Sequence, residues 1–373
     1  MSEWTMVRLG DVVKLISGRD LVPEQYNDQN KGVPYITGAS NIDDGNVIIN
    51  RWTTEPVVIS KPDDILITCK GTVGLTAFND FGICHLARQI MAIRADTNIV
   101  DNKYLKYAVD GSFLKLLRKA RSMIPGVSRE DILSLTLPLP PLDEQKRIAD
   151  VLDKASELIK KRKEQIRLMD ELAKSLFIEM FGDPVENPMG WNVKPFTTAA
   201  IIDTNMTTDF EKYANYPHIG IESIERDSGR ILNYNLVKDD HLSSGKYTFG
   251  KQHIIYSKIR PNLNKVALPN FDGLCSADAY PILPKDTANK FYLAYILRSK
   301  HFLDYILKHS DRTNIPKANK KQLEGYKLPL PPISLQNEFA DRIDAIEQQK
   351  ALLQDGLAKM ETAYKALMQE YFG

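Results

Sequence analysis

The chain has 373 residues, of which 43% are hydrophobic, and a formal net charge of +1, so it can build two or more cored domains and carries no global charge that would attract nucleic acid. Its three cysteines, Cys69, Cys84 and Cys275, show neither metal-site nor disulfide-framework spacing, which predicts a reducing cytoplasm. The N-terminal residues lack the pattern of a signal peptide, and no apolar run is long enough to cross a bilayer, so we expect no membrane partner.

Residues 1–136 are predicted to form a first head of mixed α/β structure. Runs rich in β-branched and aromatic residues at 33–37, 63–68 and 88–94 indicate strands, and a helical pattern covers 102–120. Two local basic stretches, CKGTVG and KLLRKARS, supply the candidate nucleic-acid contacts of this head, which are Lys70, Thr72, Lys115, Lys119, Arg118 and Arg121.

A first tail follows at 137–182 and opens with LPLPPLDEQKRIA. Its prolines exclude a helix at the start, so we expect a stiff joint, then a helix with Asp143 as its N-cap and Gly182 at its C-terminal end. Apolar residues then recur at alternating steps of four and three, which predicts a coiled-coil seam interrupted by Arg162. The seam residues are Ile148, Leu152, Ile159, Ile166, Met169 and Leu176.

The second head, 183–327, and the second tail, 328–373, repeat this organisation. Strands are expected at 253–257 and 278–283, a helical stretch at 289–310, and a tail helix with Ser334 as its N-cap and a polar break at Lys350. The candidate nucleic-acid contacts are Lys258, Arg260, Asn262, Lys265, Arg312, Asn314 and Lys317. The seam residues are Phe339, Ile343, Leu353, Leu357, Met360 and Leu367.

The two tails are copies of one sequence. An offset of 191 residues aligns 137–182 with 328–373 without a gap, and 15 of the 46 pairs are identical, including Gln145 with Gln336 and Phe181 with Phe372. Chance matching would give about three identities, so the chain is an internal duplication. The heads have diverged far more than the tails, which indicates one shared task for the tails and two separate recognition tasks for the heads.

The narrow apolar seam of each tail needs a partner, and the other tail is the nearest one. We therefore predict an α+β protein with two mixed α/β heads in a pseudo-two-fold arrangement, separated by an antiparallel two-helix coiled coil. Each helix of about 38 residues would be about 57 Å long. Arg162 and Lys350 both fall near mid-helix, with Glu164 and Asp355 as possible partners that would fix the register, or both side chains simply reach out to water.

No catalytic motif is recognisable. The sequence lacks a phosphate-binding loop, a glycine-rich dinucleotide loop and an amino-methyltransferase signature, and its histidines show no metal-ligand spacing. PDDILITCK at 62–70 is faintly similar to a metal-dependent nuclease core, but Thr68 stands where the second carboxylate is required. We expect no catalytic residue and no metal. Arginine, asparagine and lysine read base edges and hold phosphates, although a basic run can also be a solvated face.

Two variable heads, each closed by an LPLPP joint and a long helix, resemble the specificity (S) subunit of type I restriction-modification systems, the HsdS family. Leu137–Ala149 is the most specific part, whereas LPLPPISLQNEFA matches less well. The resemblance implies that each head is a target recognition domain for one half of a bipartite asymmetric DNA site. The paired helices would set the spacer and dock two methyltransferase (M) subunits, with two restriction/translocase (R) subunits as further partners. S-adenosylmethionine, ATP and Mg would belong to those partner subunits.

Two other interpretations remain open from the residues alone. A stand-alone two-headed DNA-binding regulator would bind DNA tightly without a partner. A structural coiled-coil protein with protein-binding heads would show no salt-dependent affinity for DNA.

Overall fold

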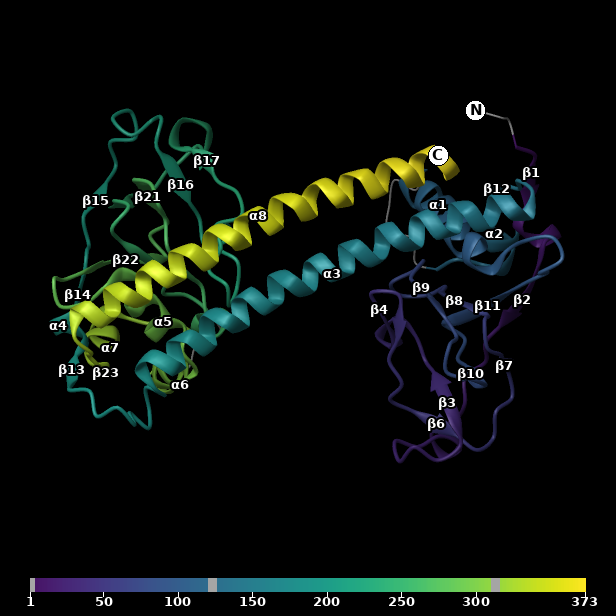
Figure 1. Ribbon diagram of the computed structural model, residues 1–373, viewed down its shortest axis with the longest axis horizontal. Helices are drawn as coiled ribbons and strands as arrows, with labels where there is room; N and C mark the ends of the chain where they lie inside the picture. The colour runs from purple at the N-terminus through teal and green to yellow at the C-terminus, as the bar shows by residue number, and fades with distance from the viewer. Residues whose placement is uncertain (1–3, 120–125, 310–315) are drawn as a thin grey trace. The chain divides into compact units, whose positions relative to one another are not determined.

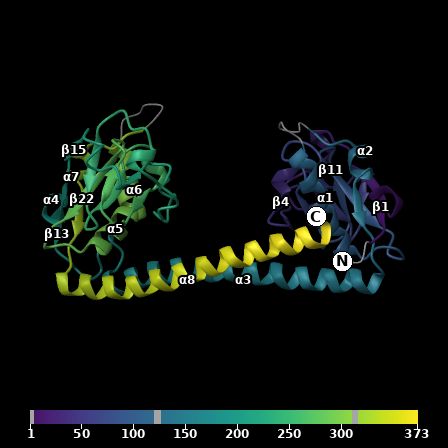
Figure 2. The same ribbon diagram turned by 90° about the horizontal axis from the view of Figure 1, so that it is seen from above.

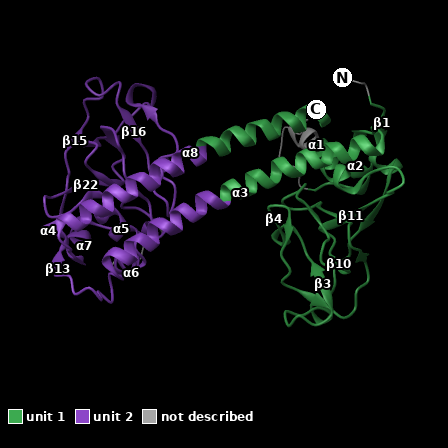
Figure 3. Cartoon of the chain, viewed as in Figure 1, with its two compact units in different colours: residues 1–163, 355–373 green, residues 164–354 purple. Residues whose placement is uncertain are grey.

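The computed structural model describes residues 4–119, 126–309 and 316–373, without the side chains of 114–119 and 309. The chain forms two compact units (Figure 3): unit 1 comprises Met1–Lys163 and Asp355–Gly373, and unit 2 comprises Glu164–Gln354. Each unit therefore contains one head and a segment of each long helix. Within the described ranges, no helix has the length and apolar character needed to span a membrane.

Unit 1 is built on two four-stranded sheets. The first is antiparallel throughout, in the order β2 (Val13–Ser17), β11 (Ile90–Ala95), β8 (Ile65–Thr68), β9 (Thr76–Phe78). The second has a parallel pair at its centre, in the order β6 (Trp52–Thr53), β3 (Val33–Ile36), β10 (Cys84–Leu86), β7 (Ile59–Ser60). The expected strands at 33–37, 63–68 and 88–94 are thus confirmed.

Smaller elements complete unit 1. They are the hairpin β4 (Ile42–Asp43) and β5 (Asn46–Val47), the helices α1 (Asn102–Lys119) and α2 (Arg129–Leu133), and the 3-10 turns η1 (Leu9–Asp11), η2 (Pro23–Gln25) and η3 (Ala39–Asn41). The helix expected over 102–120 is confirmed as α1.

Unit 2 repeats both sheets. The antiparallel sheet has the order β14 (Ala200–Ile202), β22 (Ala279–Pro284), β19 (Ile254–Ser257), β20 (Val266–Ala267). The other sheet has the order β15 (Met206–Thr207), β18 (Lys246–Phe249), β21 (Gly273–Cys275), β16 (Pro217–Ile219), β17 (Asn235–Leu236), again with a central parallel pair. Because the strand order matches that of unit 1 apart from the added β15, the duplication seen in the tails extends through the heads.

Unit 2 also has short helices on its strand connections. They are α4 (Phe196–Ala199), α5 (Lys290–Arg298), α6 (Lys300–His309), α7 (Lys320–Glu324), η4 (Val237–Asp239) and η5 (Pro261–Leu263). The single helical stretch expected over 289–310 is wrong in one respect. Ser299 adopts an extended conformation with φ −63° and ψ 149°, which divides the stretch into α5 and α6.

The two tails form the long helices α3 (Leu142–Phe181) and α8 (Ile333–Phe372), each 40 residues long and therefore about 60 Å in length. Within each unit the helices lie side by side and antiparallel (Figure 1, Figure 2). In unit 1, Ile148 shares a core with Phe372, whereas Lys163 Nζ lies 3.3 Å from a Glu361 carboxylate oxygen further along. The expected fold class, two mixed heads with a pair of antiparallel long helices, is confirmed.

An aromatic residue at the end of one long helix completes the core of each unit. In unit 1, Phe372 of α8 packs against Tyr104 of α1 with ring centroids 5.4 Å apart. In unit 2, Phe181 of α3 packs against Tyr292 of α5 with centroids 4.8 Å apart. Phe181 and Phe372 are equivalent in the repeat, so each half of the chain supplies the aromatic residue that seals the head of the other half.

The LPLPP segments are structured joints. The first residues of each segment form a short strand that pairs antiparallel with the strand opening the head: β12 (Thr136–Pro138) with β1 (Met6–Arg8), and β23 (Lys327–Pro329) with β13 (Val193–Pro195). The hydroxyl groups of Tyr104 and Tyr292 donate to the carbonyls of Pro138 and Pro329, each at 2.7 Å. The joint is therefore fixed to the core helix of its own head.

Gln145 and Gln336 hold the start of each long helix against its head. Both side chains are buried, and each accepts one backbone N–H and donates to two carbonyls, one of them from a joint proline. The partners are Asp101, Ile99 and Pro140 for Gln145 (2.7, 3.1 and 2.8 Å) and Asn289, Thr287 and Pro331 for Gln336 (2.8, 3.2 and 2.8 Å). This shared geometry explains why both copies keep a glutamine here.

The expected N-caps are wrong by two residues. Asp143 and Ser334 lie inside the first turn of α3 and α8. The carbonyls of Pro141 and Pro332 accept the first intrahelical hydrogen bonds, from the N–H groups of Gln145 and Gln336. Pro141 and Pro332 therefore occupy the N-cap positions, and a proline side chain has no atom that could accept a capping hydrogen bond. Gly182 does end α3, in the left-handed region with φ +75°.

Candidate nucleic-acid interface

The long helices place the predicted seam between them. Every seam residue is buried or half-buried. Those in unit 1 are Ile148, Leu152, Ile159, Leu357, Met360 and Leu367, and those in unit 2 are Ile166, Met169, Leu176, Phe339, Ile343 and Leu353. Apolar side chains of both helices thus pack together in each unit and carry the heads.

The two polar breaks in the seam have different surroundings. Lys350 is buried in unit 2, and its ammonium group donates to Asp170 of α3 at 2.5 Å. Arg162 of unit 1 is half-buried and faces Gly356 of α8, where a Cβ would come within 2.3 Å of its Nη1. The one glycine within the α8 segment of unit 1 therefore makes room for the arginine.

Lys350 uses neither of the partners expected for the polar breaks, because Asp170 accepts its hydrogen bond. Glu164 accepts hydrogen bonds from Arg167 of its own helix, and Asp355 accepts one from Lys359 of its own helix. Carboxylates three or four residues from a cation on the same helix are within its reach. The expected pairing of Arg162 with Glu164 or Asp355 stays a prediction.

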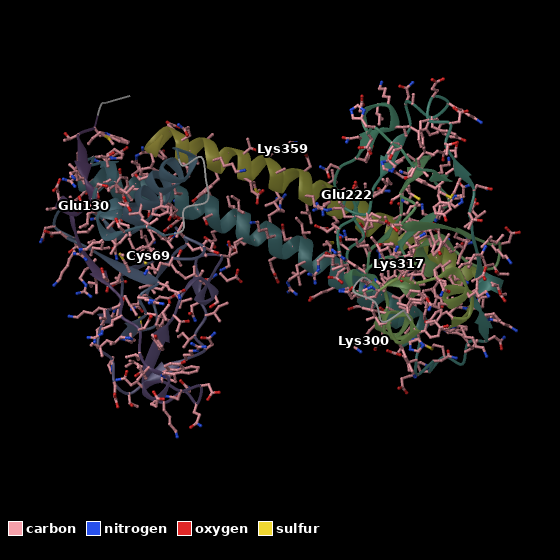
Figure 4. All side chains as sticks on the ribbon, turned by 180° about the vertical axis from the view of Figure 1, so that it is seen from behind. Cys69, Glu130, Glu222, Lys300, Lys317 and Lys359 are labelled. Atoms are coloured by element: carbon pink, nitrogen blue, oxygen red, sulfur yellow. The ribbon has the colours of Figure 1, made fainter. Side chains whose placement is uncertain are left out.

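In unit 1, the loop after β8 carries the candidate contacts Lys70 and Thr72, both exposed. Cys69, labelled in Figure 4, marks the point where this loop leaves the sheet, and its carbonyl accepts the N–H of Val127 at 2.8 Å. Lys70 also forms an isolated antiparallel bridge with Gly126. The loop is therefore tied to the segment that leads from α1 back to the joint.

In unit 2, the loop after β19 is tied in the same way. Ile259 forms an isolated bridge with Lys317, and the N–H of Ala318 donates to the carbonyl of Lys258 at 2.7 Å. Arg260, Asn262 and Lys317, the last labelled in Figure 4, are exposed. In unit 2, two stretches that lie far apart in sequence and were singled out for their charge thus meet on one loop cluster. In unit 1 the loop meets Gly126 and Val127, which follow the second charged stretch.

Three of the predicted contacts have internal partners, and one of them is the exposed Lys317, whose Nζ lies 3.9 Å from a carboxylate oxygen of Asp278. Lys258 lies over the rings of Tyr280 and Tyr247, with Nζ 4.9 and 5.8 Å from the ring centroids. Burial, together with the like charge of Lys317, lowers its pKa, although Asp278 opposes this. Lys265 donates to the carbonyl of Ile221 at 2.8 Å. Lys258 and Lys265 hold the loop in place. The exposed Arg260, Asn262 and Lys317 form its outer surface.

The remaining predicted contacts lie outside what the structure describes. Lys115, Arg118 and Lys119 fall on α1 at positions whose side chains are not among the described ones. Arg121, Arg312 and Asn314 fall in 120–125 and 310–315, outside the described residues.

The acidic residue at the centre of the nuclease-like segment 62–70 has a structural role. Asp64 is buried, and both its carboxylate oxygens accept bonds from Arg94, from Nε and Nη2 at 2.7 Å each. It also accepts hydrogen bonds from Ser60 and from the N–H of Lys61. Among the residues that the structure describes, no group of three or more His, Cys, Asp or Glu side chains could hold a metal ion.

Comparison with known families gives two matches in this one chain. The family described as the type I restriction modification DNA specificity domain matches residues 1–168 and 195–362. The first match covers the first head, its joint and most of α3, and the second covers nearly all of the second head, its joint and most of α8. The chain belongs to this family. The specificity-domain family thus appears here as two copies, in agreement with the internal duplication.

The chain is also similar, over nearly its whole length, to curated proteins that are named as specificity subunits. The chain is 25% identical to the type I restriction enzyme EcoDI specificity subunit of Escherichia coli, over 99% of this chain and 88% of the relative. It is 24% identical to the MjaVIII specificity subunit of Methanocaldococcus jannaschii, over 98% of this chain and 91% of that one. The similarity therefore extends along nearly the whole chain and along most of each relative.

Two solved structures share the fold. The S subunit of a type I restriction-modification system from M. genitalium matches with a TM-score of 0.62 and 15% identity, covering 99% of this chain and 96% of that one. A chain from a structure of type I R-M complex assembly and conformational transition matches with a TM-score of 0.52 and 20% identity, covering 100% and 98%. The specificity-domain architecture is therefore that of the whole chain.

Proposed function

We propose that this protein is the DNA-specificity subunit of a type I restriction-modification enzyme. Each unit would read one half of a bipartite asymmetric site on double-stranded DNA. The observation that carries this proposal is the presence of two specificity-domain copies with one strand order and different loop sequences. Two recognition domains with the same fold and different loops match a DNA site whose two halves differ in sequence.

The loops after β8 and β19 are the part of each head that we assign to DNA. Each loop presents exposed polar and basic side chains and is backed by a second segment through a backbone bridge. Lys70 and Lys317 would meet phosphates, because lysine is a flexible point charge suited to backbone contacts. The overall charge of +1 means that affinity must come from such local patches.

The paired helices would set the spacing between half-sites and dock two M subunits. Exposed leucines on the outer surface support a docking role, since isolated charged helices do not need them. They are Leu158, Leu168 and Leu172 of α3 and Leu352 of α8, with exposed fractions of 55, 46, 50 and 68%. R subunits would join the same assembly.

The chain itself would be non-catalytic. Methyl transfer with S-adenosylmethionine, and ATP- and Mg-dependent translocation and cleavage, would be performed by the M and R subunits. The free buried thiols of Cys69, Cys84 and Cys275 suit a cytoplasmic assembly, where thiols stay reduced.

Methylome sequencing tests the proposal. Cells that express the M subunit encoded with this chain would be compared with and without the chain. We expect methylated adenines in one bipartite motif that vanishes when the chain is removed. A methylation pattern that is independent of the chain would contradict the proposal, as would tight sequence-specific DNA binding by the chain alone.

A further inference from the structure

The loop between β19 and β20 contains an unusual backbone conformation. Arg260, directly before η5, adopts the left-handed region with φ 47° and ψ 57°. A residue with a Cβ is disfavoured there, because the Cβ crowds the neighbouring carbonyl group. The conformation therefore costs free energy. An arginine is expected here only if its side chain has a task that a glycine could not perform.

In unit 1 a glycine occupies the equivalent left-handed position. Lys70 and Ile259 occupy equivalent places, since each follows the corresponding strand and forms the isolated bridge to the segment before the joint. The next residue is Gly71 in unit 1, with φ +73°, and Arg260 in unit 2. A Cβ at Gly71 would meet nothing within 4 Å, so the glycine is there for its backbone alone. Unit 2 has instead kept a long cationic side chain at a strained position.

The surroundings of Arg260 prevent the strain from relaxing. Its N–H donates to the carbonyl of Pro316 and its carbonyl accepts the N–H of Leu263, both at 2.9 Å. Pro261 is buried, and the side chain of Asn264 donates to the carbonyl of Arg298 at 3.0 Å. These contacts fix the backbone at Arg260, and with it the direction in which the side chain leaves the loop. Strained backbone that is held in this way is typical of functional sites.

The guanidinium of Arg260 is exposed and has no partner among the described residues. Other arginines of unit 2 bind within the protein: Arg230 and Arg342 bind carboxylates, and Arg298 donates to the carbonyl of Val266. The donors of Arg260 are therefore presented outward from a rigid loop, close in the chain to Lys258 and joined by a bridge to the segment of Lys317.

We propose that Arg260 reads a guanine in the half-site recognised by unit 2, donating two parallel N–H bonds to its O6 and N7 atoms. This is the pairing that the planar fork of a guanidinium makes with a guanine edge in the major groove. A phosphate contact would not need an arginine at a strained position, because a lysine elsewhere on the loop can bind phosphate as a point charge. The assignment rests on the proposed function, and it names one residue that determines the sequence read by one half.

Methylome sequencing with variants of the full chain, expressed with its M subunit, tests the assignment. We expect Arg260→Lys and Arg260→Gly each to relax one guanine position in one half-site, while the other half-site and the gap stay unchanged. Arg226→Lys, a matched exposed arginine of unit 2 that binds its neighbour Asp227, should leave the motif intact.

Each other result overturns the assignment. If Arg260→Lys keeps the guanine, the side chain is a phosphate contact. If no variant changes the motif, or if neither half-site of the wild-type motif contains a guanine, Arg260 does not read one. If the wild-type chain directs no bipartite motif, the proposed function itself fails, which is a different outcome.

A second measurement separates recognition from folding. Glycine relieves the left-handed strain, so Arg260→Gly should melt at a higher temperature than the wild-type chain while losing specificity. A lower melting temperature would mean that the arginine serves the fold, and the assignment would fall.

Discussion

The ammonium group of Lys350 on α8 donates a hydrogen bond to Asp170 of α3, so a buried cation is held inside the seam of unit 2. The lysine side chain is 9% exposed, whereas the aspartate is 41% exposed, and Glu347 lies 3.7 Å from the same ammonium group. In the repeat, the position of Lys350 corresponds to Ile159, an apolar seam residue. The two halves of one seam therefore use different chemistry at equivalent places.

Removal of the aspartate should cost more than removal of the lysine. We expect Asp170→Asn to lower the free energy of unfolding by about 1–2 kcal/mol, because it leaves the buried ammonium with Glu347 alone. Lys350→Ile, which copies the other half, should change it by less than about 1 kcal/mol. Urea unfolding of the wild-type chain, of the two single variants and of the variant that combines Asp170→Asn with Lys350→Ile checks this. A larger loss for Lys350→Ile than for Asp170→Asn would show that the pair is a net source of stability.

The joint glutamines should be costly to replace. Gln145→Ala leaves a buried N–H and two carbonyls without their partner, so we expect a loss of about 2–4 kcal/mol. Gln336→Ala should do the same in unit 2, since its three bonds are equivalent. Gln348, an exposed glutamine of α8, is the control and should tolerate alanine within about 0.5 kcal/mol. Equal effects at all three positions, measured by urea unfolding, would contradict the structural role of the joint.

His85 should make unit 1 sensitive to mild acid. Burial lowers the pKa of His85, although its hydrogen bond with the carbonyl of Arg19 (2.8 Å) acts in the opposite direction. The unfolded chain takes up this proton near pH 6.5, whereas the folded protein takes it up only at lower pH. The unfolded state therefore binds more protons in this window, and stability falls as the pH falls from about 6.5 through the folded pKa.

The variant His85→Gln isolates this contribution. Its melting temperature should depend less on pH than that of the wild-type chain between about pH 7 and pH 5. Identical slopes for the two proteins, measured by calorimetry, would rule out His85 as the source.

Lys70 and Lys317 should each contribute one phosphate contact. Their alanine variants, assembled with the M subunit, should weaken DNA binding similarly for all sequences and reduce the slope of log affinity against log salt by about one. Lys300, an exposed lysine of α6 labelled in Figure 4, is the matched control and should leave the slope unchanged. A change of sequence preference in either variant would assign that lysine to base reading.

The length of the paired helices should set the distance between half-sites. Insertion of one heptad into both helices, between Lys163 and Glu164 and between Gln354 and Asp355, adds about 10 Å to each. We expect the unread gap in the methylated motif to widen by about three base pairs, given about 3.4 Å per base pair. A motif with an unchanged gap would refute the spacer role of the helices.

The sequence predicted the long helices well because their signal is local and long. Periodic apolar residues, flanking prolines and Gly182 mark α3 and α8 to within one or two residues of their ends. The strand order of the heads could not be predicted, since it depends on pairing between short runs far apart in the chain. The duplication explains why the two heads nevertheless share it.

The candidate site was predictable only as a set of residue types. The basic stretches pointed to the loops after β8 and β19, but not to the bridges that back them. Nothing local showed that Lys265 donates to Ile221 or that Lys258 lies over two tyrosine rings. The left-handed turn at Arg260 also escaped prediction, although the glycine at the equivalent place in CKGTVG carried the signal.

The segment Asp355–Gly373 belongs to the same compact unit as the first head. On the ribosome, unit 2 has its whole contiguous sequence once residue 354 has emerged, whereas the first head still lacks Phe372 beside Tyr104. We therefore expect the later-synthesised half to reach its native packing first. The core of the earlier-synthesised half would stay incomplete until Phe372 has emerged. The two halves would therefore reach their native packing in the reverse of the order in which they are translated.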